Sequence, residues 1–265
     1  MVKMDTIVNT VQINNSAEAG VAVMGTSMTI RNGWGDARII GAVCLGDTDD
    51  ITRSIITCPS WSDANGVSVP VVSCVATDLP NIKLEDYIFP VPIPVQPSDV
   101  LTHTHTSETA ANTQAVGLIW VEYMKGGQNW EKAGDGAQAI VCRNFTAGGN
   151  LVSLTDTVQT AITSLAANKT YQVIGVKSNG IAAGTAGNVG PLLIGFYAGP
   201  GEFGGAQLIL PMPRGLDTGG PNMIDLVKAG MRTPRFKGGQ DLAWKLYDFT
   251  AEQPQGEIIL AVDKP

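Results

Sequence analysis

Short apolar runs, separated by turns rich in Gly and Pro, dominate the chain. Residues 100–106 alternate, which places Leu101, His103 and His105 on one face of a strand and the intervening threonines on the other. Residues 117–124 are almost continuously apolar, as expected of a strand that is covered on both faces. Further strands are predicted at 192–197, 208–210 and 258–262. This spacing of short strands is typical of a β-sandwich or a barrel.

Helical patterns are few. Residues 223–229, with Asn222 as N-cap and Gly230 just past the end, predict a short helix. The spacing of apolar residues in 156–167 favours a second helix, although this segment is rich in Thr. The prolines of residues 90–97 predict an edge strand or an extended connector, because proline donates no hydrogen bond to a sheet.

A similar pattern occurs near the end of each half of the chain. An Asp-led strand pattern followed by an apolar run occupies residues 99–123 and reappears at 241–262. Other matched segments keep the same order in both halves: 12–20 with 141–149, 29–43 with 173–197, and 87–92 with 208–213. One interpretation is that any two hairpins rich in Val, Ile and Gly look alike. The alternative, a duplication, predicts two similar β domains.

Residues 125–136 form the natural boundary between such domains, which are therefore predicted at 1–130 and 131–265. The offsets between matched segments vary, so each half must carry an insertion. The predicted insertions are 47–77 in the first half and 214–238 in the second. Insertions of this kind fall in surface loops, where partner-specific contacts are expected.

Composition narrows the possible functions. Charged residues make up 15% of the chain, below the usual ~25%, which favours a surface that is covered by partners. The net charge is −7 and neither end carries a basic arm, so direct nucleic-acid binding is not expected. No apolar run reaches the length of a membrane helix. The N-terminus has no signal-peptide core, which predicts synthesis in a cytosol.

Candidate metal ligands are sparse. His103 and His105 share a strand face and could chelate a metal, but a structural zinc site needs about four ligands and no motif completes the set. Asp47, Asp49 and Asp50 resemble a calcium loop but lack the Gly and the distal Glu of an EF-hand. We therefore expect neither a metal nor a cofactor.

Catalytic motifs are also missing. The chain has no GxSxG nucleophile elbow and no phosphate-binding GK[ST] loop, so no catalytic residue is expected. The cysteines form no CxxC pair and are predicted to be reduced, buried thiols, with disulfides as the alternative: Cys44, Cys58, Cys74 and Cys142. Three tryptophans could stack on sugars or lie at subunit contacts: Trp34, Trp61 and Trp130.

The terminal hairpins at 99–123 and 241–262, the insertion at 221–230 and the Gly-rich, weakly charged composition resemble one family. This family is the double jelly-roll major capsid proteins of tailless phages, archaeal viruses and adenovirus-like viruses. The resemblance is architectural and covers the whole chain. It implies an all-β fold of two tandem eight-stranded jelly-roll (β-sandwich) domains, with one or two short helices in loops.

The resemblance also implies a function. A coat protein of this kind trimerises into pseudo-hexameric capsomers, which tile an icosahedral shell. Its partners would be further copies of itself, other capsid or vertex proteins and an internal membrane. It would be made in the host cytoplasm and reside in the virion. Two alternatives remain open: a carbohydrate-binding or adhesion β-sandwich module, and an enzyme on a β scaffold such as a glycoside hydrolase or a cupin-like metalloenzyme.

Overall fold

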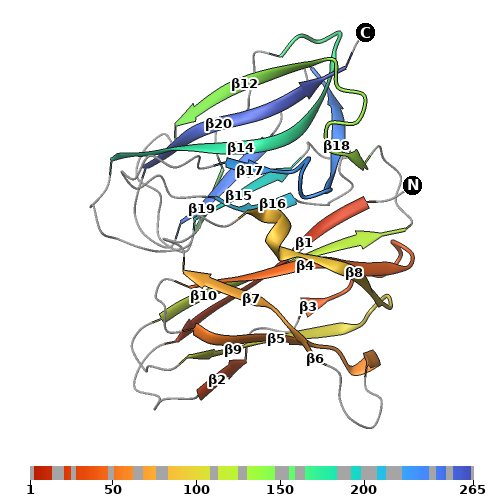
Figure 1. Ribbon diagram of the computed structural model, residues 1–265, viewed down its shortest axis with the longest axis vertical. Coiled ribbons are helices and arrows are strands. Elements are labelled where there is room, and N and C mark those ends of the chain that lie inside the picture. Colours follow the sequence, from red (N-terminus) through yellow and green to blue (C-terminus); the bar gives the residue numbers. More distant parts are fainter. Residues whose placement is uncertain are drawn as a thin grey trace.

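The fold is described from a computed structural model of the chain. It describes residues 3–13, 21–24, 28–46, 51–61, 68–75, 83–107, 113–124, 130–146, 155–158, 165–183, 192–197, 208–212, 223–238, 243–248 and 253–263. These residues form four β-sheets (Figure 1). Within them, no helix is long and apolar enough to cross a bilayer.

The first half of the chain forms two sheets that share a hydrophobic core. The first sheet has the order β1 (Lys3–Ile13), β10 (Thr113–Tyr123), β4 (Ala37–Gly46), with β7 (Val72–Val75) and β8 (Ile88–Val95) both on β4. The second has the order β2 (Val21–Met24), β9 (Val100–Ser107), β5 (Ile51–Thr57), β6 (Ser68–Pro70), with β3 (Met28–Thr29) on β9. Two 3-10 helices accompany them: η1 (Pro59–Trp61) and η3 (Leu84–Tyr87).

The second half also forms two sheets. The first has the order β12 (Ala139–Thr146), β20 (Gln253–Val262), β14 (Thr170–Ala183), β18 (Arg232–Lys237), β11 (Trp130–Lys132), with β17 (Met223–Asp225) on β14. The second has the order β13 (Thr155–Val158), β19 (Ala243–Asp248), β15 (Leu192–Tyr197), β16 (Leu208–Pro211). In Figure 1 the four sheets lie one above another, with the second half at the top.

The two halves repeat one strand order. The series β1, β10, β4, β8 of the first half corresponds to β12, β20, β14, β18 of the second, and β2, β9, β5, β6 to β13, β19, β15, β16. In the first half β1 therefore pairs with β10, and β10 with β4; in the second half β12 pairs with β20, and β20 with β14. The predicted all-β class is confirmed, and the short helices of the described residues are the two 3-10 turns.

A β-bulge that occurs in both halves shows which residues of the two halves correspond. Trp120 pairs with Gly41 and the next residue with Ile39, so Ile40 is an extra, bulged residue in β4. In the second half, Ile259 pairs with Gly175 and Leu260 with Val173, which leaves Ile174 as the bulged residue of β14. The segment 39–42 (IIGA) thus corresponds to 173–176 (VIGV).

The glycine after each bulge is required by the same close approach. A Cβ at Gly41 would lie 2.6 Å from the carbonyl oxygen of Tyr87, and a Cβ at Gly175 would lie 2.9 Å from that of Ile224. Tyr87 directly precedes β8, and Ile224 lies in β17, the short strand that occupies the corresponding place on β14. The two halves therefore share a detail of backbone packing as well as a strand order.

This register corrects part of the repeat inferred from sequence. The match of 99–123 with 241–262 falls on corresponding strands, β9–β10 and β19–β20. Two other internal matches are wrong, because 37–43 belongs with β14 instead of β15, and 87–92 lies in β8, whose counterpart is not β16. Several strands share the same Val, Ile and Gly content, so only long-range pairing distinguishes them.

The helix predicted at 223–229 is wrong. Met223–Asp225 forms β17, and residues 226–230 form turns. The Asp225 carboxylate accepts hydrogen bonds at 3.0 Å from the backbone N–H groups of Val227 and Lys228, so it closes a turn after the strand. Gly230 has φ of 65°, which suits glycine. Residues 156–158 of the other predicted helix belong to β13 and residues 165–167 are not helical, whereas residues 159–164 lie outside the described part of the chain.

The remaining strand predictions are confirmed at β9, β10, β15, β16 and β20. The proline-rich segment forms β8, which pairs with β4 and with no other described strand, as predicted for an edge. Pro94 lies opposite Arg38 but has no N–H to donate to it. The carbonyl of Pro94 accepts a hydrogen bond from the Trp61 indole instead, so it faces away from β4, and the alternation along a strand puts Pro92 and Pro90 on the same side.

Candidate functional site

The two histidines meet inside the first half. His103 and His105 lie on the inner face of β9, as their alternation predicts, and are fully buried. The Ser54 hydroxyl, from β5, lies 2.5 Å from Nε2 of His103 and 3.1 Å from Nδ1 of His105. The Cys44 sulfur, from β4, lies 3.1 Å from the same Nδ1 atom. The imidazole rings are tilted against each other, with centroids 4.3 Å apart.

Burial keeps both imidazoles neutral. Desolvation, followed by the charge on His105, lowers the pKa of His103 from 6.5 to about 3. Desolvation alone lowers the pKa of His105 to about 4. The side chains that approach the rings in these contacts are the hydroxyl of Ser54 and the sulfur of Cys44, and neither is a carboxylate.

The contact between Ser54 and His103 resembles that of a catalytic nucleophile and its general base, but both side chains are buried away from solvent. Ser54 is 2% exposed and both histidines are 0% exposed. A Cβ at Gly117 would collide with Nδ1 of His103, so the ring lies directly against the backbone of β10. A substrate cannot reach these atoms in this conformation, and the cluster is best described as a polar part of the core.

The expectation that the chain holds no metal stays a prediction from sequence. In the described part of the chain, no group of three or more His, Cys, Asp or Glu side chains is placed to hold a metal ion. His103 and His105 are brought together, but each faces Ser54. Asp47, Asp49 and Asp50, the candidate calcium ligands, lie outside the described residues.

The cysteines only partly match their prediction. Cys44, Cys58 and Cys142 are free thiols. Cys44 and Cys58 are buried, as expected, but Cys142 is exposed because β12 is an edge strand with β20 as its described partner. The side chain of Cys74 lies outside the described part of the chain.

The tryptophans are less exposed than their sequence context suggests. Trp130 is 3% exposed and belongs to the core. Trp34 packs edge-on against Tyr123, with ring centroids 5.0 Å apart. The Trp61 indole donates a hydrogen bond of 3.2 Å to the carbonyl of Pro94. A flat row of exposed aromatic rings, as a sugar-binding face would need, is not formed by these three residues.

The contact between the two halves is built from specific hydrogen bonds. The Trp120 indole, on β10, donates to the carbonyl of Ile209 in β16 at 2.9 Å. The Thr6 hydroxyl, on β1, accepts a hydrogen bond of 3.0 Å from the backbone N–H of Ile209. All three residues are buried, so these bonds form away from water and hold β16 in one register on the first half.

A buried carboxylate also joins the halves. Glu122 is 5% exposed and accepts hydrogen bonds from Nε of Arg38 at 2.7 Å and from Nε of Arg232 at 3.2 Å. Arg38 belongs to the first half and Arg232 to the second. The backbone N–H of Arg232 also lies 3.2 Å from the sulfur of Met4. The sequence carried one signal for this site, a lone acid inside the apolar run 117–124.

The hydrophobic core is continuous across this contact. We call the side of β1, β10 and β4 that faces the second half the junction face. Its apolar residues join the core cluster of the second half: Met4, Ile40, Val43, Leu45, Val116, Leu118 and Trp120. The opposite side of the same strands lines the separate core of the first half. This explains why β10 is apolar along its length, as predicted.

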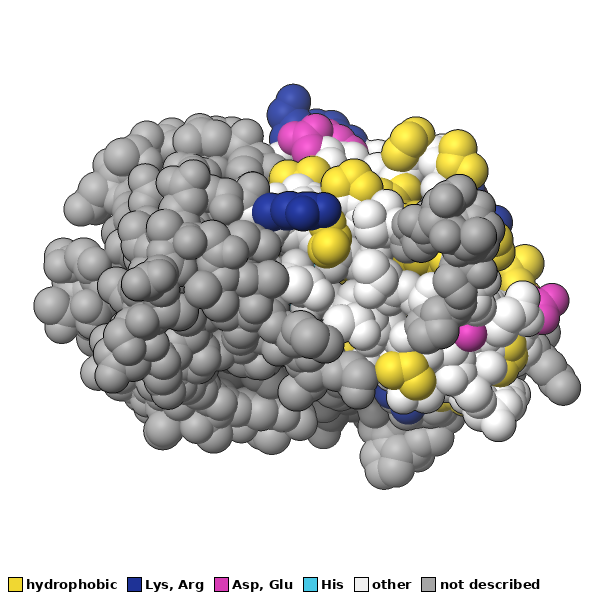
Figure 2. Space-filling view, turned by 90° about the horizontal axis from the view of Figure 1, so that it is seen from below, with side chains coloured by type: hydrophobic (Ala, Val, Ile, Leu, Met, Phe, Trp, Pro, Cys, Tyr) yellow, Lys and Arg dark blue, Asp and Glu magenta, His cyan; other side chains and the backbone are white. Residues whose placement is uncertain are grey.

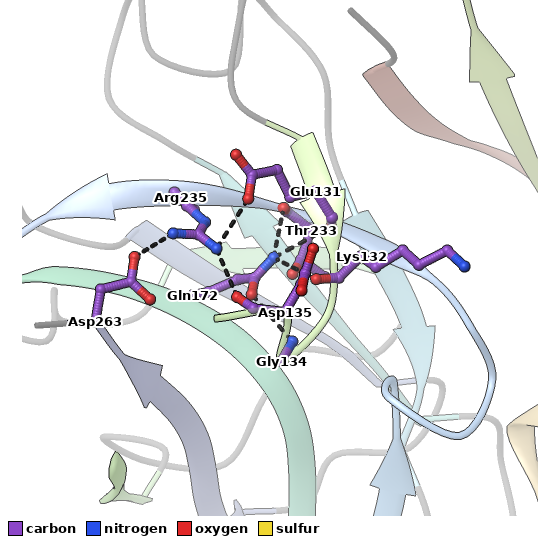
Figure 3. A network of polar contacts seen from close by, with 8 residues as sticks. All are labelled: Glu131, Lys132, Gly134, Asp135, Gln172, Thr233, Arg235 and Asp263. Atoms are coloured by element: carbon purple, nitrogen blue, oxygen red, sulfur yellow. Dashed lines mark hydrogen bonds and ion pairs between the residues drawn. The ribbon is translucent and has the colours of Figure 1, made fainter. Parts of the chain in front are cut away.

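A polar network pins the segment that links the halves (Figure 3). The buried amide of Gln172 donates to the carbonyls of Glu131, Lys132 and Thr233 at 3.1, 3.2 and 3.1 Å. Its oxygen accepts from the N–H of Gly134 at 3.0 Å. One side chain therefore satisfies four backbone groups of the linking segment and β18, which is consistent with a structural role.

Arg235 completes this network and reaches the end of the last strand (Figure 3). Its guanidinium forms an ion pair with Asp263 and another, at 2.8 Å, with Glu131. It also donates to the carbonyl of Asp135 at 2.5 Å. The linking segment and the residue after β20 are therefore held by the same cation.

The described surface bears scattered apolar side chains. Figure 2 views the side of the sheet that contains β9 and β5, and none of the described residues visible there is a histidine, in agreement with their burial. The exposed large apolar residues of the described chain are Val72, Val91, Val100, Met124, Ile140, Met223 and Val227. Two of them are far more exposed than the rest: Val91 at 73% and Ile140 at 64%.

Comparison with known proteins gives no family assignment. No family model matches the chain, and no curated protein matches it. Among solved structures, it is similar to the major capsid protein P2 of bacteriophage PM2, with 10% identity over 97% of this chain and 98% of that chain and a TM-score of 0.28. A Penaeus vannamei nodavirus particle gives 9% identity over 100% and 99% of the two chains, with a TM-score of 0.27.

A third similar structure is the STIV MCP, with 11% identity over 100% of this chain and 97% of that chain and a TM-score of 0.21. Identities near 10% combined with these TM-scores are too low to carry an argument about this chain. The case for a function must therefore come from the chain's own repeated architecture.

Proposed function

We propose that the chain is a structural coat protein that trimerises into pseudo-hexameric capsomers and tiles an icosahedral viral shell. The observation that carries the proposal is the repetition between halves: the same strand order, the same β-bulge and the same glycine beside it. In this proposal, residues 1–130 and 131–265 are two jelly-roll domains.

The repetition has a geometric use. Three copies of a chain with two similar halves present six similar units around one axis, and such a unit can occupy the place of a hexagon in a closed surface. Contacts that join different patches of identical chains close into rings when the rotation fits. A chain with one half could form the same tile only with six copies.

The chemistry of the chain supports the same role. Charged residues make up 15% of the sequence, which lowers the cost of burying surface between copies. The Ser54–His103 pair is buried in a core, as a packing element would be. Further capsid or vertex proteins and an internal membrane are proposed partners, the virion is the proposed location, and host cytoplasm is the proposed site of synthesis.

The proposal is tested by the assembly state of the purified full-length chain. We expect native mass spectrometry to detect trimers, and electron microscopy of concentrated samples to show hexagonal tiles or closed shells. A chain that stays monomeric at all accessible concentrations and salt conditions would contradict the proposal. Soluble glycans and metal salts serve as controls, since neither should change the assembly state.

A further inference from the structure

We infer that the contact between the halves is repeated between copies, so that the β8 edge of one copy docks on the second half of the next. This inference rests on the proposed self-assembly and identifies the surfaces that carry it. Within one chain, β16 and β18 of the second half contact the junction face of the first. The counterparts of both surfaces, in the other half of each copy, are partly exposed.

The first counterpart is the outer side of β12 and β20, which we call the distal face. The shared bulge equates Trp120 with Ile259, and the strand pairings extend that match. The junction-face residues Met4, Thr6, Trp120 and Glu122 correspond in turn to Ile140, Cys142, Ile259 and Ala261. The distal face thus repeats the position of the junction face but has no carboxylate at the place of Glu122.

The second counterpart is the β8 edge. Gln172 pairs with Arg235 in the second half, as Arg38 pairs with Pro94 in the first. Arg232 lies three residues before Arg235, and Val91 lies three residues before Pro94, so Arg232 and Val91 occupy corresponding positions. In the second half Arg232 is the residue that reaches across to the junction face. In the first half Val91 is the most exposed apolar residue of the described chain.

The two exposed surfaces are complementary in chemistry. Within the chain, Arg232 contacts Met4 and Glu122, so a cation meets a thioether and a carboxylate. Between copies, Val91 would meet Ile140, which is exposed, beside the position of Ala261, which is already covered within the chain, so that the contact is apolar. Val91 thus stands in place of Arg232, and Ala261 stands in place of Glu122. Both members of the ion pair are replaced by apolar residues, so neither replacement leaves a charge without a partner.

A second pair of strands fits the same arrangement. Ile209 of β16 lies against Trp120 and Thr6 within the chain. The counterpart of β16 is β6, which has exposed Ser68 and Pro70 and half-buried Val69 between them. It would lie against Ile259 and Cys142 of the distal face. An exposed Cys142 on an edge strand is thereby covered in the assembly.

The occupant of the distal face is therefore a second copy of this chain. The contact is heterologous, because the β8 edge and the distal face are different surfaces, and each copy has one of each. Such contacts either close into a ring or continue as a filament. Three copies close the ring when the step between copies equals the step between the two halves of a chain and each step is one sixth of a full turn, which is the trimer proposed above.

Charge substitutions on either surface test the contact. Val91→Glu and Ile140→Glu each place a carboxylate in a desolvated apolar contact, and we expect the concentration for half-association to rise about 100-fold or more. Val227→Glu is the matched control, because Val227 is 48% exposed and lies just after β17, whose described partner is β14 and not β12 or β20. Circular dichroism should show that all three variants keep the β spectrum.

A compensating pair tests the proposed neighbour directly. Val91→Arg combined with Ile140→Glu creates an ion pair at the place where Arg232 meets Met4 within the chain, and we expect association to recover relative to Ile140→Glu alone. In a Cys142→Ser background, Val91→Cys with Ile140→Cys should form disulfides between copies that end at a three-chain species. A ladder continuing beyond three chains would overturn the closed ring.

The outcomes separate this inference from the proposed function. If the natural chain forms trimers and both glutamate variants do so equally well, the surfaces are wrong while the coat function stands. The same holds if one glutamate variant is impaired and the other is not. If the natural chain never associates, the proposed function fails and this inference fails with it.

Discussion

At the scale of single residues, the buried histidine pair makes the first half sensitive to acid. Both imidazoles are neutral when folded, with pKa values lowered to about 3 and about 4, whereas an unfolded histidine titrates near 6.5. The unfolded chain therefore binds more protons between these values. Stability is fully present above pH ~6.5 and is lost as the pH falls toward the folded pKa values.

The corresponding prediction concerns the pH dependence of unfolding. We expect the free energy of unfolding to fall between pH 6 and 4 with a slope approaching about 2.7 kcal/mol per pH unit, since two protons are taken up. Urea unfolding followed by tryptophan fluorescence measures this slope. In the double variant His103→Asn with His105→Asn the histidine contribution should disappear, leaving that of the carboxylates. Parallel slopes in the two proteins would refute the assignment.

Sequence predicted only part of this residue-level picture. Alternation along 100–106 placed both histidines on one face, because a strand has a period of two. Ser54 and Cys44, their partners, are 49 and 61 residues away from the histidines that they approach. No local pattern indicates such contacts, since they depend on which strands pair. Glu122 was also missed, although a lone acid in an apolar run is a local signal of a buried charge that needs a partner.

At the scale of elements, the paired bulges should be equally intolerant of a side chain. Gly41→Ala and Gly175→Ala each bring a Cβ within 3 Å of a backbone carbonyl that cannot rotate away. We expect each substitution to lower the free energy of unfolding by about 1–3 kcal/mol. Thermal unfolding measures the effect, with Val91→Ala on the exposed β8 edge as the control. A neutral Gly175→Ala would argue that the two bulges are not equivalent.

The strands themselves were largely predictable, whereas their correspondence was not. Continuous apolar runs identified β10, β15, β16 and β20, because strands covered on both sides need no polar face. The predicted helix at 223–229 failed where Asp225 bonds to the next backbone N–H groups and closes a turn. Helix-capping and turn-forming residues are the same types, so the sequence alone did not distinguish them.

At the scale of the molecule, the two halves should unfold as one unit. The core cluster runs from the junction face into the second half without interruption. Residues 1–130 expressed alone would expose that apolar face to water, so we expect the isolated first half to aggregate or to bind hydrophobic dyes. Calorimetry of the full chain should give one cooperative transition. Two well-separated transitions would contradict this expectation.

The indole of Trp120 offers a finer test of the same coupling. Trp120→Phe removes the hydrogen bond to the carbonyl of Ile209 while keeping an aromatic ring in place. We expect a loss of about 1–3 kcal/mol, because a buried acceptor loses its donor. The single calorimetric transition should move to lower temperature without splitting. Thr57→Ser, at a half-buried position of β5 away from the junction face, should shift it little.

The prolines of β8 have a consequence for how a crowded solution of this chain behaves. Pro90, Pro92 and Pro94 leave the free side of that strand without N–H donors at every second residue. A strand from another molecule cannot extend the sheet along this side of β8, so this edge strand is a poor starting point for amyloid. Copies of the chain that meet at the β8 edge can contact each other only through side chains. Such contacts are reversible, so incorrectly associated copies can dissociate and associate again.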